Sequence, residues 1–287
     1  MKKFEFLIIL LIIFFFGIST GYYKHFPFNF VYLIKSKFNS STTPYKRNYD
    51  ISLYDAKAID ITKNTGIYLT YGQSNSTNHG QIGYVVKNQV YQFFKGITYI
   101  YEDPALGGTG NSGSVWGMVG DKLINKGVHD KVIFSSCGMG SAKIEELNSG
   151  ANLKYLIENF EYQMREFGRV DGILFHQGES NNNNNAGNDN YYNEFVKLLS
   201  ELKKNGVDIP IYLSRVSFCG DPSSHDDELI KKQNKIIRDF ENVYEGPNTD
   251  LLSDKKYRLP DRCHFSMLGY DMFSDLWVES LINNNLK

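Results

Sequence analysis

Residues 66–75 have the sequence GIYLTYGQSN, and this stretch indicates the fold more clearly than any other. Residues 67–70 form a short apolar run that stops at Gly72, which is typical of a buried parallel strand. The polar tripeptide Gln-Ser-Asn follows at once, at residues 73–75. The stretch therefore predicts a strand of an α/β sheet with polar side chains at its carboxyl end.

The chain beyond this stretch alternates between short apolar runs, which predict strands, and apolar residues at helical spacing, which predict helices. We expect strands at residues 131–136, 172–175 and 209–218, and helices at residues 114–126, 153–167, 191–204, 226–240 and 266–282. Such alternation favours a parallel sheet covered by helices on both faces. We therefore predict an α/β fold, a three-layer α/β/α sandwich with a central parallel sheet of the flavodoxin-like kind.

Residues 1–23 form an N-terminal hydrophobic segment, in which Lys2 and Lys3 precede an uncharged, mostly apolar stretch. The stretch is about as short as a membrane-crossing helix can be, and the basic start favours a cytoplasmic N-terminus. We expect an uncleaved signal anchor, with a cleaved signal peptide as the alternative. Either one exports the rest of the chain, which is then membrane-anchored through this segment, or secreted or periplasmic. Residues 24–65 lack periodicity, and we expect a linker or stalk.

Charge and histidine spacing narrow the range of partners. The net charge is −1, so the chain has no excess of basic residues to collect nucleic acid, and we expect no nucleic-acid partner. The histidines show no spacing typical of zinc ligands, so we expect no metal and no cofactor. The sequence carries no indication of the oligomeric state.

The cysteines are Cys137, Cys219 and Cys263, an odd number for an exported chain. At most one internal disulfide can form among the three. We favour a bond between Cys219 and Cys263, because both follow predicted strand ends on the same edge. Three buried free thiols are an equally open alternative.

The polar residues gather where the predicted strands and the last loop end. In an open α/β sheet, the ligand site lies outside the carboxyl ends of the strands. Residues 73–75, 138–140 and 176–180 each follow a predicted strand, and residues 261–265 precede the closing helix. We expect these segments to converge on one mouth.

The residue types at these ends match what acyl transfer needs. A serine hydroxyl becomes a good nucleophile when a base accepts its proton, and imidazole is the natural base when a carboxylate orients it. Asp261 and His264 are three residues apart in one loop, and Ser74 would meet them through the fold. Candidate donors to the developing oxyanion are the backbone N–H groups of Ser74 and Gly140 and the side-chain amide of Gln177.

Taken in order, these segments resemble the SGNH (GDSL-like) hydrolases. The segments are GQSN at residues 72–75, the glycine block at 138–140, HQGES at 176–180, and Asp261 followed three residues later by His264. They are most similar to the branch of sialate O-acetylesterases and acetylxylan esterases among the carbohydrate esterases. A match at one segment alone would carry little weight, whereas four in this order are fairly specific.

The resemblance covers about residues 66–280 and implies roles for individual residues. It implies that Ser74 is the nucleophile, His264 the base and Asp261 its partner, with Ser74, Gly140 and Gln177 as oxyanion donors and with Gln73, Asn75 and Glu179 supporting the site. Two departures are Phe175, where the branch often has Trp, and Cys263 beside the base. The absence of a G-x-S-x-G elbow from the sequence disfavours the α/β-hydrolase fold.

The resemblance also implies an activity. We expect residues 66–287 to form an SGNH-type domain that hydrolyses O-acetyl esters on a carbohydrate, sialic acid or another glycan, through an acyl-enzyme intermediate. An O-acyltransferase with the same triad is one alternative. A catalytically silent glycan-binding protein is the other, although such a protein has no need of all three triad residues.

Overall fold

The computed structural model describes residues 50–81, 83–182 and 190–285, which all belong to one compact unit, Lys46–Lys287. The predicted signal anchor or signal peptide at residues 1–23 lies outside the described residues, and so do residues 24–49 of the predicted linker. Within the described ranges, no helix combines the length and the apolar character that crossing a bilayer requires.

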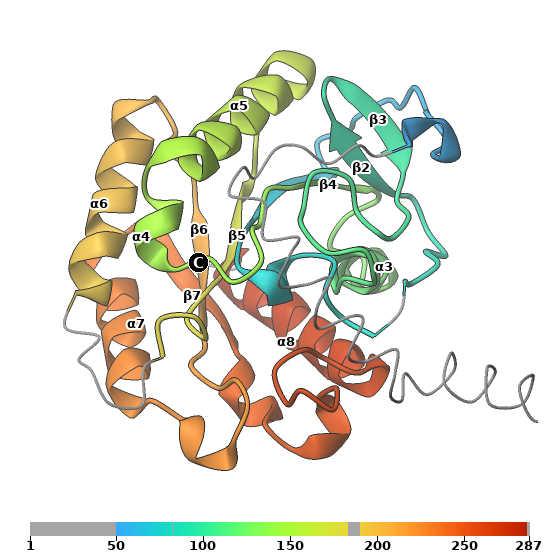
Figure 1. Cartoon of the computed structure of the whole chain (residues 1–287). Coiled ribbons are helices and arrows are strands. Elements are labelled where there is room, and N and C mark those ends of the chain that lie inside the picture. Colours follow the sequence, from blue (N-terminus) through green and yellow to red (C-terminus); the bar gives the residue numbers. More distant parts are fainter. Residues whose placement is uncertain (1–49, 82, 183–189, 286–287) are drawn as a thin grey trace, which may run out of the picture. The chain divides into compact units, whose positions relative to one another are not determined.

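A seven-stranded sheet with the strand order β3-β2-β4-β1-β5-β6-β7 forms the middle of the domain (Figure 1). The strands are β1 Gly66–Gly72, β2 Val90–Phe94, β3 Ile97–Ile100, β4 Val132–Ser136, β5 Gly172–His176, β6 Ile211–Arg215 and β7 Val243–Asn248. All neighbouring pairs are parallel except β2 with β3, which are antiparallel. The predicted α/β class with a largely parallel central sheet is therefore confirmed.

Helices cover both faces of this sheet, as the alternation along the chain predicts. Neighbouring residues of a strand point to opposite faces, so Tyr68 of β1 packs in one apolar cluster and Leu69 in the other. The cluster around Tyr68 includes residues of α3 (Trp116–Asn125) and α8 (Met267–Asn285). The cluster around Leu69 includes residues of α4 (Ile144–Leu147), α5 (Gly150–Phe167), α6 (Tyr191–Lys204) and α7 (Asp227–Asp239). Figure 1 shows the two groups of helices on the two sides of the strands.

The sequence pattern did not predict β2, β3, β7 or α4. The strands β2 and β3 form a hairpin whose two turn residues, Lys95 and Gly96, both have positive φ, as a tight hairpin turn requires. The strand β7 contains Gly246 and Pro247, which weaken a strand signal in the sequence. Its place at the edge of the sheet explains why a proline is tolerated there.

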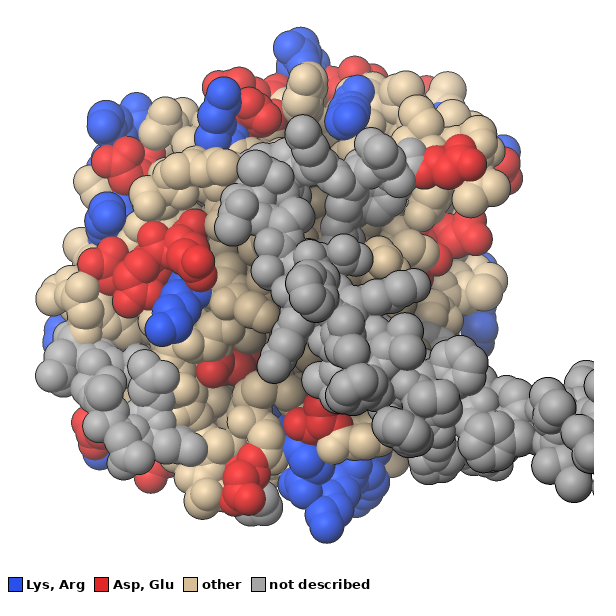
Figure 2. All heavy atoms as spheres, in the orientation of Figure 1, with Lys and Arg blue, Asp and Glu red and all other residues tan. Residues whose placement is uncertain are grey.

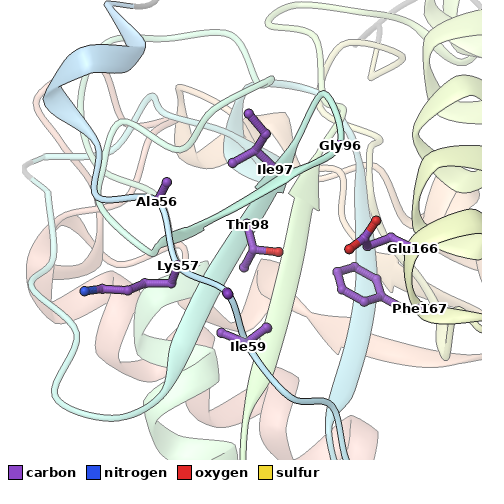
Figure 3. Close-up of a pocket in the computed structure, with 9 residues that line it drawn as sticks. Ala56, Lys57, Ile59, Gly96, Ile97, Thr98, Glu166 and Phe167 are labelled. Carbon is purple, nitrogen blue, oxygen red and sulfur yellow. The ribbon is translucent and has the colours of Figure 1, made fainter.

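Residues 50–65 of the predicted linker are described, and residues 55–57 of them pair with the outer edge of β3. Ala56 forms an antiparallel bridge with Tyr99, and the backbone N–H of Lys57 donates to the carbonyl of Thr98 at 2.9 Å. A pocket of about 350 Å³ lies between this segment, the start of β3 and the end of α5 (Figure 3). None of the predicted site residues lines this pocket.

Acidic and basic side chains are interspersed over the face drawn in Figure 2, and the net charge of the chain is −1. The described atoms of that face therefore present no extended field of a single sign, of the kind that collects nucleic acid.

The favoured disulfide forms in the structure, between Cys219 in the loop after β6 and Cys263 in the loop before α8. Cys137 is a buried free thiol. The bond joins residues 44 positions apart in sequence. It therefore restricts the unfolded chain and fixes the loop that contains Asp261 and His264.

Replacing both Cys219 and Cys263 by serine should lower the free energy of unfolding by about 4 kcal/mol, the loop-closure value for a loop of this length. The measurement is urea unfolding without reductant, with Cys137→Ser as the control that leaves the disulfide intact. An unchanged unfolding midpoint in the double variant would contradict the role given to this bond.

Candidate active site

Ser74 lies immediately beyond the carboxyl end of β1, and a glycine places it there. Gly72 has a φ of +137°, and a Cβ atom at this position would lie 1.9 Å from the carbonyl oxygen of His176. This close approach lets the N–H of Gln73 donate to the same carbonyl at 3.0 Å. The chain then enters the short 3₁₀ helix η2 (Ser74–Ser76), so Ser74 begins a turn that rests on the end of β5.

The side chain of Gln73 holds the loop that follows β5. Its Oε1 atom accepts hydrogen bonds from the backbone N–H groups of Ser180 at 2.8 Å and Gly178 at 3.3 Å. Gln73 is buried, so these N–H groups have a protein partner in place of water. The ends of β1 and β5 are thereby tied together through a side chain as well as through the backbone.

Glu179 is a buried carboxylate at the base of the site. Its Oε1 atom accepts from Nε2 of His176 at 2.9 Å and from Nδ2 of Asn75 at 2.8 Å. Burial raises the pKa of Glu179, but the charge of His176 and the two hydrogen bonds outweigh burial and lower this pKa to about 2. Its second oxygen, Oε2, is buried without a partner among the described residues.

Asn75 connects Glu179 to the loop that contains His264. Its Nδ2 atom also donates to the carbonyl of Cys263, at 3.1 Å. The same carbonyl accepts from Nη1 of Arg258 at 2.6 Å, and the Arg258 guanidinium lies 3.9 Å from the ring centre of Phe265. Burial lowers the pKa of Arg258 to about 10, partly opposed by the charge of Glu179. The residue before His264 is thus fixed from two sides.

Asp261 and His264 form a hydrogen-bonded pair. Oδ2 of Asp261 lies 2.7 Å from Nδ1 of His264, and Oδ1 accepts from the backbone N–H groups of Cys263 at 2.9 Å and His264 at 3.0 Å. Burial raises the pKa of Asp261, but the bonds to His264 and the backbone lower it to about 2. The carboxylate therefore remains ionised and holds the proton of His264 on Nδ1.

The other ring nitrogen of His264, Nε2, is buried and has no hydrogen-bonding partner among the described residues. It therefore makes no hydrogen bond to the Ser74 hydroxyl in this structure. Ser74 itself is 6% exposed. Asn75, next to Ser74, is bonded to Cys263, next to His264, so the two predicted catalytic residues belong to segments that touch.

The two predicted oxyanion donors besides Ser74 have other partners in this structure. The N–H of Gly140 donates to Oγ1 of Thr109 at 2.5 Å. Gln177 is buried, and its Nε2 atom donates to Oδ1 of Asn181 at 2.6 Å. Both groups lie in the loops at the carboxyl ends of β4 and β5, as expected, but both donate to protein acceptors.

Three residues of the site were not singled out from the sequence. Thr109 meets the glycine block, His79 stacks on His264, and Arg258 fixes the carbonyl of Cys263. The only available signal for Arg258 and His79 was proximity in sequence, to Asp261 and Ser74 respectively. Among the residues that the structure describes, no cluster of three or more His, Cys, Asp or Glu side chains is arranged to hold a metal ion.

Comparisons with known proteins agree with this fold. A comparison with curated proteins finds no significant match. Similar solved structures include a protein of Arabidopsis thaliana, with 14% identity, 77% of this chain and 98% of that chain covered, and a TM-score of 0.61. The psychrotrophic esterase EstA of Pseudoalteromonas sp. has 10% identity and a TM-score of 0.50, and the match covers 78% of this chain and 100% of that chain. A carbohydrate acetylesterase of Xanthomonas citri has 14% identity and a TM-score of 0.51, and the match covers 75% of this chain and 55% of that chain. At these identities the likeness shows a shared fold.

A match to a family model identifies the family of this chain. The model described as carbohydrate esterase, sialic acid-specific acetylesterase, matches residues 115–283, which is more than half of the chain. The matched region contains Gln177, Asp261 and His264 and begins after Ser74. The chain therefore belongs to this carbohydrate esterase family of sialic acid-specific acetylesterases.

Proposed function

We propose that this carbohydrate O-acetylesterase works through an acyl-enzyme intermediate, with Ser74 as nucleophile, His264 as general base and Asp261 as the residue that orients the base. The observation that carries the proposal is the 2.7 Å contact between Asp261 and Nδ1 of His264, while Nε2 of the same ring has no partner within the part of the chain that the structure describes. That nitrogen is the one that must accept a proton from a serine.

The proposed reaction has two steps that mirror each other. In the first, Ser74 Oγ attacks the acetyl carbonyl carbon while its proton passes to Nε2 of His264. The bond to the sugar oxygen then breaks, and the sugar hydroxyl leaves with that proton. In the second step, water attacks the acetyl-Ser74 ester, His264 takes and returns a proton in the same way, and acetate leaves.

The developing negative charge on the carbonyl oxygen needs N–H donors. The backbone N–H of Ser74 is the first such donor in this proposal. The N–H of Gly140 can join it by sharing its hydrogen between Thr109 Oγ1 and the oxyanion, and the Gln177 amide once it leaves Asn181. Until then, we propose that Gln177 and Gly140 fix the two neighbouring loops.

The substrate we propose is an O-acetylated carbohydrate, sialic acid or another acetylated glycan. The family description supports this choice, as does the name of the similar Xanthomonas citri protein, a carbohydrate acetylesterase. We also propose that the domain acts outside the cytoplasm, on the basis of the basic and then apolar residues 1–23 in the sequence.

Ser74→Ala should lower kcat/KM for acetate release by about 10³-fold or more, because the acyl-enzyme can no longer form. The assay uses O-acetylated sugars and a chromogenic acetate ester with the full-length chain. The matched control is Ser76→Ala, which removes a buried hydroxyl from the same 3₁₀ turn and should stay within about tenfold of the parent. Equal activities of parent and Ser74→Ala would exclude Ser74 as the nucleophile.

Asp261→Asn should lower kcat by about 10³- to 10⁴-fold while the fold persists, because an amide no longer holds the His264 proton on Nδ1. Asp254→Asn changes an exposed carboxylate that caps the helix η5 (Lys255–Tyr257) nearby, and it should stay within about twofold. If both variants retained parental kcat, Asp261 would not be the orienting residue.

Glu179→Gln should destabilise the protein in a pH-dependent way. The folded-state pKa of about 2 lies below the ordinary value of 4.5, so the ionised Glu179 contributes stability above pH 4.5. That contribution is lost as the pH falls from 4.5 toward 2. Urea unfolding over a pH series should show the gap between parent and variant narrowing through this window, and a constant gap would contradict the assignment.

A further inference from the structure

The imidazole of His79 lies against the imidazole of His264. The two ring centres are 5.5 Å apart, and the ring planes differ by 19°. This is the geometry of offset stacked rings, whose centres lie within the 4.5–7 Å range of such pairs. His79 comes three residues after the end of η2, so the turn that begins with Ser74 also delivers this second ring.

Two glycines make room for the His79 ring on its other sides. A Cβ atom at Gly140 would lie 2.9 Å from His79 Nε2, and one at Gly110 would lie 2.7 Å from His79 Cδ2. A side chain at Gly140 would meet the ring first, whereas one at Gly110 would first meet the carbonyl oxygen of Asn78, at 1.9 Å. The missing side chain of Gly140 therefore leaves the space that the His79 ring occupies. The backbone of Gly140 also contacts Thr109.

Thr109 orients the His79 ring. Its Oγ1 atom accepts from Gly140 N–H at 2.5 Å and lies 3.2 Å from His79 Nε2. The hydroxyl of Thr77 is directed at the Thr109 carbonyl, at 2.6 Å. Thr109 thus contacts both the backbone of Gly140 and one nitrogen of the His79 ring.

We infer that His79 is a positioning residue for His264: its stacked ring holds the base in the plane set by Asp261 and faces the imidazolium that forms during acyl transfer. This inference rests on the proposed function of Ser74 and His264. The base needs support of this kind because, among the described residues, one edge of its ring bonds Asp261 and the opposite nitrogen has no hydrogen-bonding partner. The π-face of an aromatic ring attracts a cationic neighbour.

Two variants of the full-length chain separate the effect of the His79 ring from the effect of its hydrogen bond to Thr109. His79→Gln keeps an amide that reaches Thr109 but has no ring, and His79→Phe keeps a ring but cannot bond Thr109. His79→Gln should lower kcat by about 10- to 100-fold with KM within about twofold, since a tilted base misplaces the proton acceptor. His79→Phe should retain kcat within about threefold. Parental kcat in His79→Gln, or an equal loss in both variants, would overturn the inference.

A second readout does not depend on turnover. In spectra of ¹³C-labelled histidine rings, the His264 resonances should move in His79→Gln, which removes the ring above them. They should move less in His79→Phe. Unmoved His264 resonances in His79→Gln would show that the rings do not stack in solution. A parent without esterase activity would instead refute the proposed function, and the spectra would still decide whether His79 holds His264.

Discussion

The buried carboxylate of Glu179 is the interaction on which the geometry of the site depends. It binds His176 at the end of β5 and Asn75 in the turn after β1, and Asn75 in turn binds the carbonyl of Cys263. One carboxylate thereby links the segment of the predicted nucleophile to the loop of the predicted base. Burying an ionised group is unfavourable unless it is paired, and here a histidine and an amide on one oxygen provide the pairing. The other oxygen has no partner in the described ranges of the chain.

The position of this link follows from the order of the strands. β1 is central, and the chain places β4 on one side of it and β5 on the other. At such a reversal, the loops after adjacent strands diverge to opposite faces and leave a crevice at the carboxyl ends. Gly72 lets the end of β1 approach β5 closely, and the disulfide at Cys263 holds the last loop against the loop after β6. The fold therefore brings segments from distant parts of the sequence together at the site.

The parts of this arrangement that depend on local patterns could be predicted from the sequence. Apolar runs and helical spacing predicted the strands β1, β4, β5 and β6 and the long helices. Three-residue spacing in one loop predicted the contact between Asp261 and His264. The hairpin of β2 and β3 escaped prediction, and so did β7, which Gly246 and Pro247 interrupt. The partners of Gly140 and Gln177 could not be predicted. Gly140 bonds the side chain of Thr109, which lies far from it in the sequence. Gln177 bonds Asn181, which a later turn of the same loop brings back to it. His79 looked like an isolated histidine until the fold stacked it on His264.

The central claim is that the acetyl group passes through Ser74, and trapping that intermediate tests it most directly. The full-length chain is mixed with a chromogenic acetate ester, quenched in acid during turnover, digested and mapped by mass spectrometry. We expect one acetyl group on the peptide that contains Ser74, formed at least as fast as acetate is released. Steady release of acetate with no acetyl on Ser74, or with acetyl only on another residue, would contradict the account.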